Sequence, residues 1–414
     1  MYREIHQCRI CGNPELEPIL DLGMQALTGV FPKTPGPVER GPLELVKCNT
    51  RAQQNACGLV QLKHSFAPEQ MYGDAYGYRS GLNRSMVQHL QKKAEEIRKA
   101  VPLSRGNVVL DIGSNDGTLL AAMNAPGVEL VGVDPSAIKF AEFYPPHARR
   151  IPDFFSAKRY FQEVGPHPAK VVTSIAMFYD LESPLQFMRE VFEVLADDGI
   201  WVFEQSYLPR MLAVNSYDTI CHEHLEYYAF KQMLWMAHKV GFEIIGLEFN
   251  AVNGGSFSVT AAKKKMARPV SAAVHKALCN ENEQALDSRE PYQAFADRVH
   301  RHRAALVERL TGLNASGLRV FGYGASTKGN VLLQYCGITS EMVQFIAEVN
   351  PDKFGSYTPG TLIPIISESE ARARKPDVFL VLPWHFRDNI VEREKSFLQA
   401  GGRLLFPLPT IELA

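Results

Sequence analysis

Four cysteines near the N-terminus have the spacing of a metal site. Cys8 and Cys11 form a C-x-x-C knuckle followed by Gly12, and Cys48 and Cys57 lie downstream. Four thiolates complete the tetrahedral coordination of Zn²⁺ and leave no open position, so we expect a structural metal. The alternatives are four reduced cysteines without metal, or a redox C-x-x-C, which normally opens a helix after a strand.

A second group, in residues 217–228, is dense in ionisable side chains around His222-Glu223-His224. A metalloprotease helix places its two histidines four residues apart, which alternating histidines do not match. Histidine titrates near neutral pH and can take a proton, and a neighbouring carboxylate can fix its tautomer. The segment therefore indicates acid–base chemistry, with a solvated polar loop as the alternative. The candidate catalytic residues are His224, Glu223, His222, Tyr179 and Tyr78.

A strand, a glycine turn and a helix follow one another at residues 107–120, with the spacing D-x-G-x-x-x-G from Asp111. This spacing differs from the dinucleotide fingerprint G-x-G-x-x-G. Asp111 and Asp116 would repel a pyrophosphate and attract the ammonium or sulfonium of S-adenosylmethionine, and Asp134 can accept hydrogen bonds from a ribose diol. The alternatives are a dinucleotide dehydrogenase or an α/β domain without ligand. The candidate cofactor-binding residues are Tyr78, Ser80, Asp111, Gly113, Asn115, Asp116, Asp134, Pro135, Asp153, Phe154, Ala176 and Phe178.

A second glycine turn, at residues 318–329, repeats this order of strand, turn and helix. It carries Ser326, Thr327 and Lys328 and no acid. Backbone amides at a helix N-terminus together with a lysine suit a phosphate group, and a purely structural turn is the alternative. The candidate substrate-binding residues are Tyr76, Cys221, Asn253, Gly254, Ser256, Tyr323, Ser326, Lys328 and Asn350.

These residues need elements that bring them together. Apolar runs predict strands at residues 107–112, 129–134, 171–176 and 199–205, with an amphipathic helix at 86–99. Further strands are expected at 343–349 and 378–382, after a helical stretch from 261 to about 308. This alternation predicts an α/β fold with a small zinc-binding domain (1–68), a central Rossmann-like class I methyltransferase domain (69–262), and a helical linker with a smaller C-terminal Rossmann-like domain (263–414).

Composition limits the possible partners. The 414 residues carry a formal net charge of −1, which argues against a nucleic-acid-binding protein. Neither a secretory signal nor a run of apolar residues long enough for a membrane span is recognisable. The seven cysteines are odd in number and are concentrated near the N-terminus, unlike a disulfide scaffold. We therefore expect a cytoplasmic protein, a monomer that acts on a small-molecule substrate.

Together the motifs resemble the nucleotide-sugar C-methyltransferases of deoxysugar pathways, over essentially the whole chain. The resemblance implies a zinc-binding domain, a central S-adenosylmethionine domain and a C-terminal domain that helps to hold a sugar nucleotide. It also implies methylation of the carbon beside the ketone of a keto-deoxysugar nucleotide, with His224 as the base. The matching segments are Cys8-x-x-Cys11-Gly12 and residues 20–23, 57–62, 78–81, 113–117, 222–224, 253–256 and 324–329.

Two positions depart from the family pattern where the substrate is expected. Cys221 stands where the family often has tyrosine, and Tyr179 stands where a histidine is frequent. A methyltransferase acting on an oxygen, a nitrogen or a non-sugar carbon is therefore the second hypothesis. A zinc-ribbon binding protein that has lost its activity is the third. The residues that argue against it are Asp111, Gly113, Asp116 and Asp134, which are all present.

Overall fold

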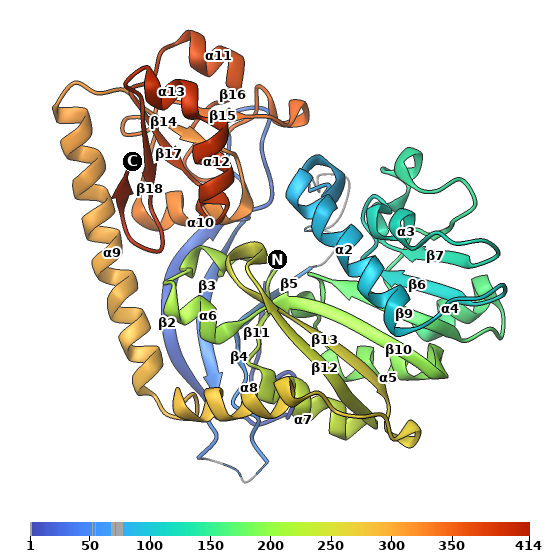
Figure 1. Ribbon diagram of the computed structural model, residues 1–414. Coiled ribbons are helices and arrows are strands. Elements are labelled where there is room, and N and C mark those ends of the chain that lie inside the picture. Colours follow the sequence, from blue (N-terminus) through green and yellow to red (C-terminus); the bar gives the residue numbers. More distant parts are fainter. Residues whose placement is uncertain (1, 52, 54, 68–70, 72–77) are drawn as a thin grey trace.

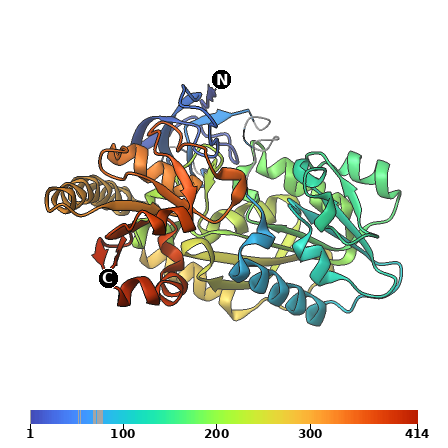
Figure 2. The same cartoon turned by 90° about the horizontal axis from the view of Figure 1, so that it is seen from above.

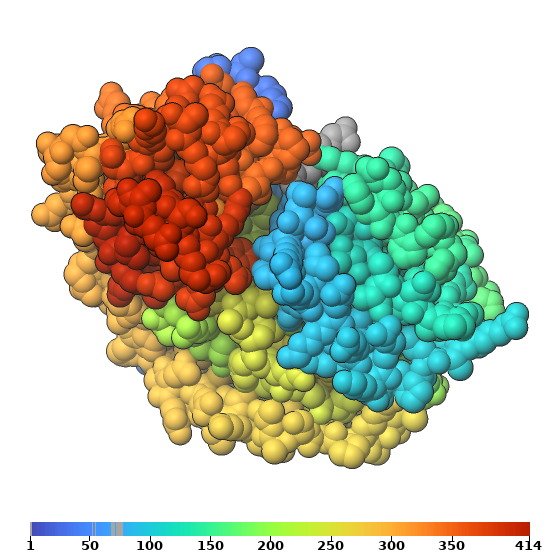
Figure 3. Space-filling model, turned by 45° about the horizontal axis from the view of Figure 1, so that its top comes forward, coloured from blue at the N-terminus to red at the C-terminus, as the bar shows by residue number. Residues whose placement is uncertain are grey.

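The computed structural model describes residues 2–51, 53, 55–67, 71 and 78–414. Tyr76, a predicted substrate residue, lies outside them. Figures 1 and 2 show two α/β units at opposite ends of the molecule, with the N-terminal strands packed against them. Figure 3 shows the surface of the C-terminal unit (orange and red) meeting helix α2 (light blue; Arg84–Ala100) along a crease.

The N-terminal sheet is antiparallel and has the strand order β11-β4-β3-β2. Leu43 and Leu45 of β3 are fully buried and two residues apart, the alternation expected of a sheet with one face on a core. A short pair of β1 (Tyr2–Glu4) and β5 (His64–Phe66) lies beside it. The four strands are β2 (Leu16–Ala26), β3 (Arg40–Cys48), β4 (Val60–Leu62) and β11 (Glu226–Tyr227).

The central sheet has seven strands in the order β12-β13-β10-β9-β6-β7-β8. Its first five strands in sequence are parallel, and β6 is buried along its whole length, as expected of a strand covered on both faces. These strands are β6 (Val108–Ile112), β7 (Glu129–Val133), β8 (Arg149–Ile151), β9 (Ala169–Ile175), β10 (Leu195–Ser206), β12 (Phe242–Asn250) and β13 (Ser256–Lys263). Its helices besides α2 are α3 (Thr118–Met123), α4 (Ala157–Val164), α5 (Pro184–Val194), α6 (Leu208–Ala213) and α7 (Phe230–Val240).

The C-terminal sheet has the order β16-β15-β14-β17-β18-β19, and all strands but the last run parallel. Helix α9 (Glu290–Ala315) runs past β2 before the chain enters this unit. The strands are β14 (Val320–Tyr323), β15 (Ile346–Glu348), β16 (Ile365–Ser367), β17 (Val378–Val381), β18 (Arg403–Phe406) and β19 (Glu412–Leu413). The other helices of this unit are α10 (Thr327–Cys336), α11 (Glu368–Ala373), α12 (Arg387–Arg393) and α13 (Lys395–Gln399). Helix α8 (Ala272–Glu283) instead packs against α7 and β12 of the central unit.

Both parallel sheets reverse their strand order at a glycine turn. In the central sheet the first strand, β6, lies between β7 and β9, and in the C-terminal sheet β14 lies between β15 and β17. In open α/β sheets, ligands bind outside the carboxyl ends of the strands at such a switch point. The turns that begin at Gly113 and Gly324 lie at these two points.

The predicted α/β fold is confirmed, with two details that the sequence did not indicate. Strand β11 comes from the central part of the chain yet pairs with β4 of the N-terminal sheet. The strand expected at 343–349 is only Ile346–Glu348, because the residues before it form a turn. None of the described helices is long and apolar enough to cross a membrane.

Candidate functional site

The four N-terminal cysteines come together although 49 positions separate Cys8 from Cys57. All four sulfur atoms lie within 4.8 Å of one another, and the Cys8–Cys57 and Cys11–Cys48 Sγ distances are both 3.5 Å. Tetrahedral Zn²⁺ with Zn–S bonds of about 2.3 Å needs sulfur atoms roughly 3.8 Å apart. The four thiols therefore fit the metal.

The zinc cluster is packed onto the central unit. Cys8, Cys48 and Cys57 are buried in one apolar core with Tyr228 and Met233. The Asn13 side-chain amide donates to Cys48 Sγ over 3.4 Å, and Gln232 of α7 donates to the Cys57 carbonyl over 2.8 Å. A site enclosed in this way has a structural role.

At the end of β6, the first glycine turn is tied to β7 through Asp134. The Asn115 amide donates to Asp134 Oδ2 over 2.8 Å, and Asp134 Oδ1 accepts from the Ser136 amide over 2.7 Å. Asn115 also holds the segment before α2, since its Oδ1 accepts from the Ser80 amide and its Nδ2 donates to the Tyr78 carbonyl. The turn thus gathers Tyr78, Ser80 and Asp134 as the sequence predicts.

The floor of this turn is acidic. Burial raises the pKa of Asp111 to about 7, although Thr173 donates a hydrogen bond of 2.6 Å to its carboxylate. A bound ammonium or sulfonium group would favour the charged form. Gly113 has φ +75°, and a Cβ there would lie 2.9 Å from Met177 Cγ. Ala176 holds a left-handed conformation (φ 56°) at the end of β9, opposite this glycine. These features fit a nucleoside-bearing methyl donor.

Several predicted cofactor residues have other roles. Both Asp116 carboxylate oxygens are used, one by Thr118 at the start of α3 and one by the Gly81 amide. Phe178 is fully buried among aromatic rings, so it does not line the crevice. Pro135 opens a short turn after β7, and Asp153 and Phe154 lie in an exposed loop after β8.

The two histidines of the 217–228 segment have different environments. His222 is 1% exposed, and its ring nitrogens lie 3.4 Å from Thr28 Oγ1 and 3.3 Å from the Gly41 carbonyl. His224 is half-buried; its Nδ1–H donates to the Thr219 carbonyl over 3.0 Å, and its ring packs edge-on against Tyr179 at 4.4 Å. Burial lowers the pKa of His222 to about 4, and burial together with the charge of Lys328 lowers the pKa of His224 to about 3.

The carboxylate between the histidines faces the N-terminal domain. Glu223 Oε2 lies 3.2 Å from Thr28 Oγ1, and a Cβ on Gly29 would lie 2.3 Å from Glu223 Oε1. Burial raises the pKa of Glu223. Cys221 is fully buried, and burial raises its thiol pKa well above the usual value. Cys221 and Glu223, one buried and one partly buried, therefore stand next to His224 in the sequence and near the charge of Lys328.

Lys328 connects the second glycine turn to the central unit. Its Nζ donates to the Asn253 carbonyl over 2.9 Å, and burial lowers the pKa of its ammonium group. A Cβ on Gly254 would touch Trp384 at 3.6 Å and His385 at 3.9 Å. The positive charge of Lys328 helps to lower the pKa values of both His224 and His385.

Four predicted substrate residues make side-chain hydrogen bonds to other parts of the chain. Tyr323 is buried in the C-terminal core, where its hydroxyl donates to Glu394 over 2.9 Å, because side chains on a strand alternate between its faces. Ser256 donates to the Val252 carbonyl, and Asn350 Oδ1 accepts from the Asp352 amide. Ser326 caps α10 by accepting from the Gly329 amide, so its role is to shape the turn.

His385, Trp384 and Asp218 are residues that the sequence analysis missed. They lie near the Lys328 ammonium group, and the indole nitrogen of Trp384 donates to Asp218 Oδ2 over 2.8 Å. The sequence did carry a signal for them. Residues 383–385 follow β17, which lies next to β14, so they lie where the C-terminal sheet reverses its strand order.

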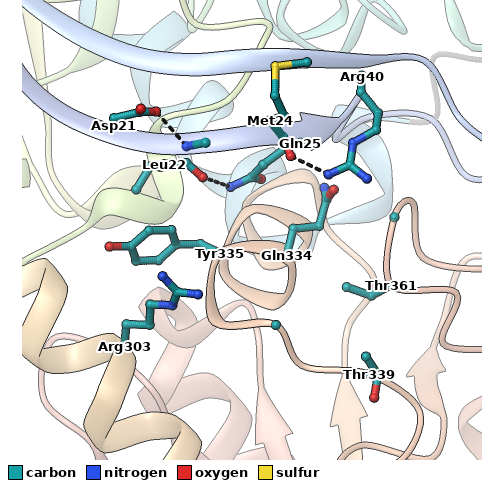
Figure 4. Close-up of a pocket in the computed structure, with 13 residues that line it drawn as sticks. Asp21, Leu22, Met24, Gln25, Arg40, Arg303, Gln334, Tyr335, Thr339 and Thr361 are labelled. Atoms are coloured by element: carbon teal, nitrogen blue, oxygen red, sulfur yellow. Dashed lines mark hydrogen bonds between the residues drawn. The ribbon is translucent and has the colours of Figure 1, made fainter.

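A cavity of about 430 Å³ lies apart from these groups, between the N-terminal sheet and helices α9 and α10 (Figure 4). Asp21, Arg40, Arg303 and Tyr335 are among the residues that line it, and none of the predicted site residues does. The candidate active site is therefore the region between the two glycine turns.

Comparison with known proteins fits this arrangement. Residues 8–72 match the model of a zinc binding domain, 86–247 that of a methyltransferase domain, and 251–409 that of a C-methyltransferase C-terminal domain. The chain is 31% identical to the C-methyltransferase NovU of Streptomyces niveus over 411 residues, which cover 98% of this chain and 96% of NovU. The chain belongs to the C-methyltransferase family. It is an S-adenosylmethionine-dependent enzyme with a structural zinc site.

Two solved methyltransferase structures match part of this C-methyltransferase. The mitomycin 7-O-methyltransferase MmcR matches with 14% identity and a TM-score of 0.35, covering 44% of this chain and 55% of MmcR. The CcbJ methyltransferase of Streptomyces caelestis matches with 15% identity and a TM-score of 0.33, covering 42% of this chain and 89% of CcbJ.

Proposed function

We propose that this C-methyltransferase acts on a keto-deoxysugar nucleotide and that His224 removes the proton from the carbon beside the ketone. The observation that carries the proposal is the hydrogen bond from His224 Nδ1 to the Thr219 carbonyl. This bond favours the tautomer with a lone pair on Nε2, the atom that takes the proton. The lowered pKa of His224, about 3, keeps the ring neutral at pH 7 and also weakens it as a base; a bound diphosphate would raise this pKa by offsetting the Lys328 charge.

A ketone makes the neighbouring C–H bond acidic enough for such a base if the developing oxyanion is stabilised. The C–H pair of electrons moves onto the ketone oxygen as the proton moves to Nε2. The Tyr179 hydroxyl and the Lys328 ammonium group are the candidate donors to that oxygen, and both lie near His224. S-adenosylmethionine, bound near Asp111, Gly113 and Asp134, supplies an electrophilic methyl group.

The second glycine turn supports a phosphorylated acceptor. Lys328 carries a positive charge in the first turn of α10, where the helix dipole also favours an anion. The Asn253 carbonyl fixes the ammonium group at the contact between the two α/β units. A diphosphate held there would place its sugar toward His224, with Gly254 leaving room beside Trp384.

Exchange of a carbon-bound proton with solvent tests the base directly. We expect the enzyme with S-adenosylhomocysteine and a keto-deoxysugar nucleotide in D₂O to incorporate deuterium beside the ketone, as read by mass spectrometry. His224→Ala should abolish exchange and lower turnover by roughly 10²–10⁴-fold, the usual contribution of a general base. Affinity for S-adenosylhomocysteine, measured by calorimetry, should stay unchanged. Turnover near the wild-type rate in this variant would contradict the assignment.

The same experiment separates the proposal from methylation of an oxygen or nitrogen. Those reactions need no broken C–H bond, so an enzyme of that type would methylate its acceptor without deuterium entering carbon. A panel of keto-sugar nucleotides and hydroxyl or amine analogues, followed by mass spectrometry, then identifies the methylated atom. Methylation of a heteroatom alone would overturn the proposed acceptor.

A further inference from the structure

Arg9, which lies between the zinc ligands Cys8 and Cys11, extends a buried side chain into the N-terminal sheet. Its Nη1 donates to the Leu62 carbonyl over 2.6 Å and its Nη2 donates to Ser65 Oγ over 2.8 Å. Its backbone amide donates to the Gln61 side chain over 3.1 Å. One arginine thus joins the zinc knuckle to β4 and β5.

Arg9 also makes an ion pair with Glu226, two residues after His224. The Nε–Oε1 distance is 3.7 Å, and the two side chains are 3% and 0% exposed. At this distance the Arg9 Nε and Glu226 Oε1 atoms make an electrostatic contact and no hydrogen bond. Burial raises the pKa of Glu226, and the Arg9 charge opposes that rise. A buried ion pair generally adds little stability over an apolar pair of similar volume. The role of this pair is therefore better explained by the segments that it holds in place.

The segment that carries His224 is held from two sides. The Leu62 amide donates to the Leu225 carbonyl over 2.8 Å, and the Leu225 amide donates to the Tyr179 carbonyl over 2.8 Å. Strand β11 has only two residues, Glu226 and Tyr227, paired with β4. Two backbone pairings are a weak attachment, so a side-chain contact at Glu226 has a large influence on where this segment lies.

We propose that Arg9 and Glu226 are positioning residues through which the zinc knuckle sets the location of His224. Zinc fixes the backbone on both sides of Arg9, Arg9 fixes Glu226, and Glu226 fixes β11 and the histidine that precedes it. This inference rests on the proposed role of His224. It assigns the N-terminal domain a part in placing the base in addition to stabilising the fold.

Substitutions at the pair test the link in the full-length, zinc-loaded protein. We expect Arg9→Met to keep its zinc and its KM for S-adenosylmethionine while kcat falls about tenfold or more, since small displacements of a catalytic group are costly. Hydrogen exchange at the amides of residues 221–228 should become faster. Arg9→Lys should restore part of kcat. Glu226→Gln, which keeps the side-chain volume, should reproduce the kcat loss if Arg9→Met folds poorly.

The matched control is Glu44→Gln, which removes a partly exposed ion pair with Lys63 in the same sheet (3.2 Å) and should change neither kcat nor exchange. Unchanged kcat and unchanged exchange in both Arg9→Met and Glu226→Gln would overturn the inference, while an inactive His224→Ala would leave the proposed function standing. Loss of zinc from Arg9→Met would also overturn it, by placing Arg9 within the metal site. If His224→Ala keeps its turnover, the proposed function fails, whatever the exchange data show.

Discussion

At the scale of single residues, two histidines two positions apart have different capacities. His222 contacts Thr28 and Gly41 through its two ring nitrogens and packs against Phe66, so it supports the loop. His224 has one nitrogen bound to the Thr219 carbonyl. Residues 222 and 223 form a turn, in which the His224 amide donates to the Cys221 carbonyl over 3.1 Å, and the two side chains therefore meet different surroundings. The chemistry of the H-E-H motif therefore belongs, in our proposal, to its second histidine.

Lys328→Met should affect substrate binding and the pH profile together. Loss of the ammonium group removes one cause of the lowered pKa of His224. The acidic limb of the profile of kcat/KM against pH should therefore move to higher pH. KM for a sugar nucleotide should rise by about tenfold or more, the value of one charge-assisted hydrogen bond. Lys33→Met, at an exposed lysine of the N-terminal domain, should change neither property; an unshifted acidic limb in Lys328→Met would contradict the electrostatic link.

At the scale of elements, the same unit of strand, glycine turn and helix is used twice with opposite charge. The first turn has Asp111 beneath it and Asp134 beside it, which suits a cationic donor. The second has Lys328, which suits an anionic acceptor. Each turn lies where its sheet reverses strand order, so backbone geometry creates the two crevices and side chains select the ligands.

Gly113→Ala should weaken binding of the methyl donor. Its new Cβ would lie 2.9 Å from Met177 Cγ and 3.2 Å from Met177 Cβ, so β6 and the end of β9 would have to move apart. Affinity for S-adenosylhomocysteine should fall by about tenfold or more, measured by calorimetry, since 1.4 kcal/mol corresponds to a factor of ten. Gly106→Ala is the control, because Gly106 also has a positive φ (+85°) but no atom within 4 Å of its Cβ position. Equal affinities of the two variants would contradict the role of this close approach.

At the scale of the whole molecule, the N-terminal domain joins the two α/β units. One apolar core runs from β2 and β3 into the C-terminal sheet, and a second joins the zinc cysteines to the central sheet. Gln334 of α10 exchanges two hydrogen bonds with the backbone of Ala26, and Asn330 donates to the Thr28 carbonyl. These contacts lie beside His222, whose ring nitrogen is 3.4 Å from Thr28 Oγ1.

Global stability should depend on pH through His222. Its pKa is about 4 in the folded protein against 6.5 when unfolded, so the unfolded chain binds more protons below pH 6.5. The contribution of neutral His222 is fully present above pH 6.5 and is lost as pH falls toward 4. Buried acids such as Asp111, with a raised pKa of about 7, act in the opposite direction. The test is therefore a comparison of the wild type with His222→Gln.

Between pH 7 and pH 5, the free energy of unfolding of the wild type should fall by about 2 kcal/mol relative to His222→Gln, from 1.36 kcal/mol per unit of pKa difference. Urea unfolding at the two pH values measures both proteins. A pH-independent difference between them would show that His222 does not titrate on unfolding.

The sequence by itself determined the local units of this C-methyltransferase: the four cysteines, the acidic and basic glycine turns, and the order of strands and helices. These follow from residue type and short-range spacing, which the chain carries locally. Only the tertiary structure decided which side chains meet. Tyr323 and Phe178 lie in cores, and Asp116 accepts hydrogen bonds from Thr118 and Gly81. Trp384 and His385, which follow a strand about 60 residues away in sequence, lie near Lys328. Side-chain direction and long-range pairing, such as β11 with β4, depend on how the three parts pack, and no local pattern encodes that packing.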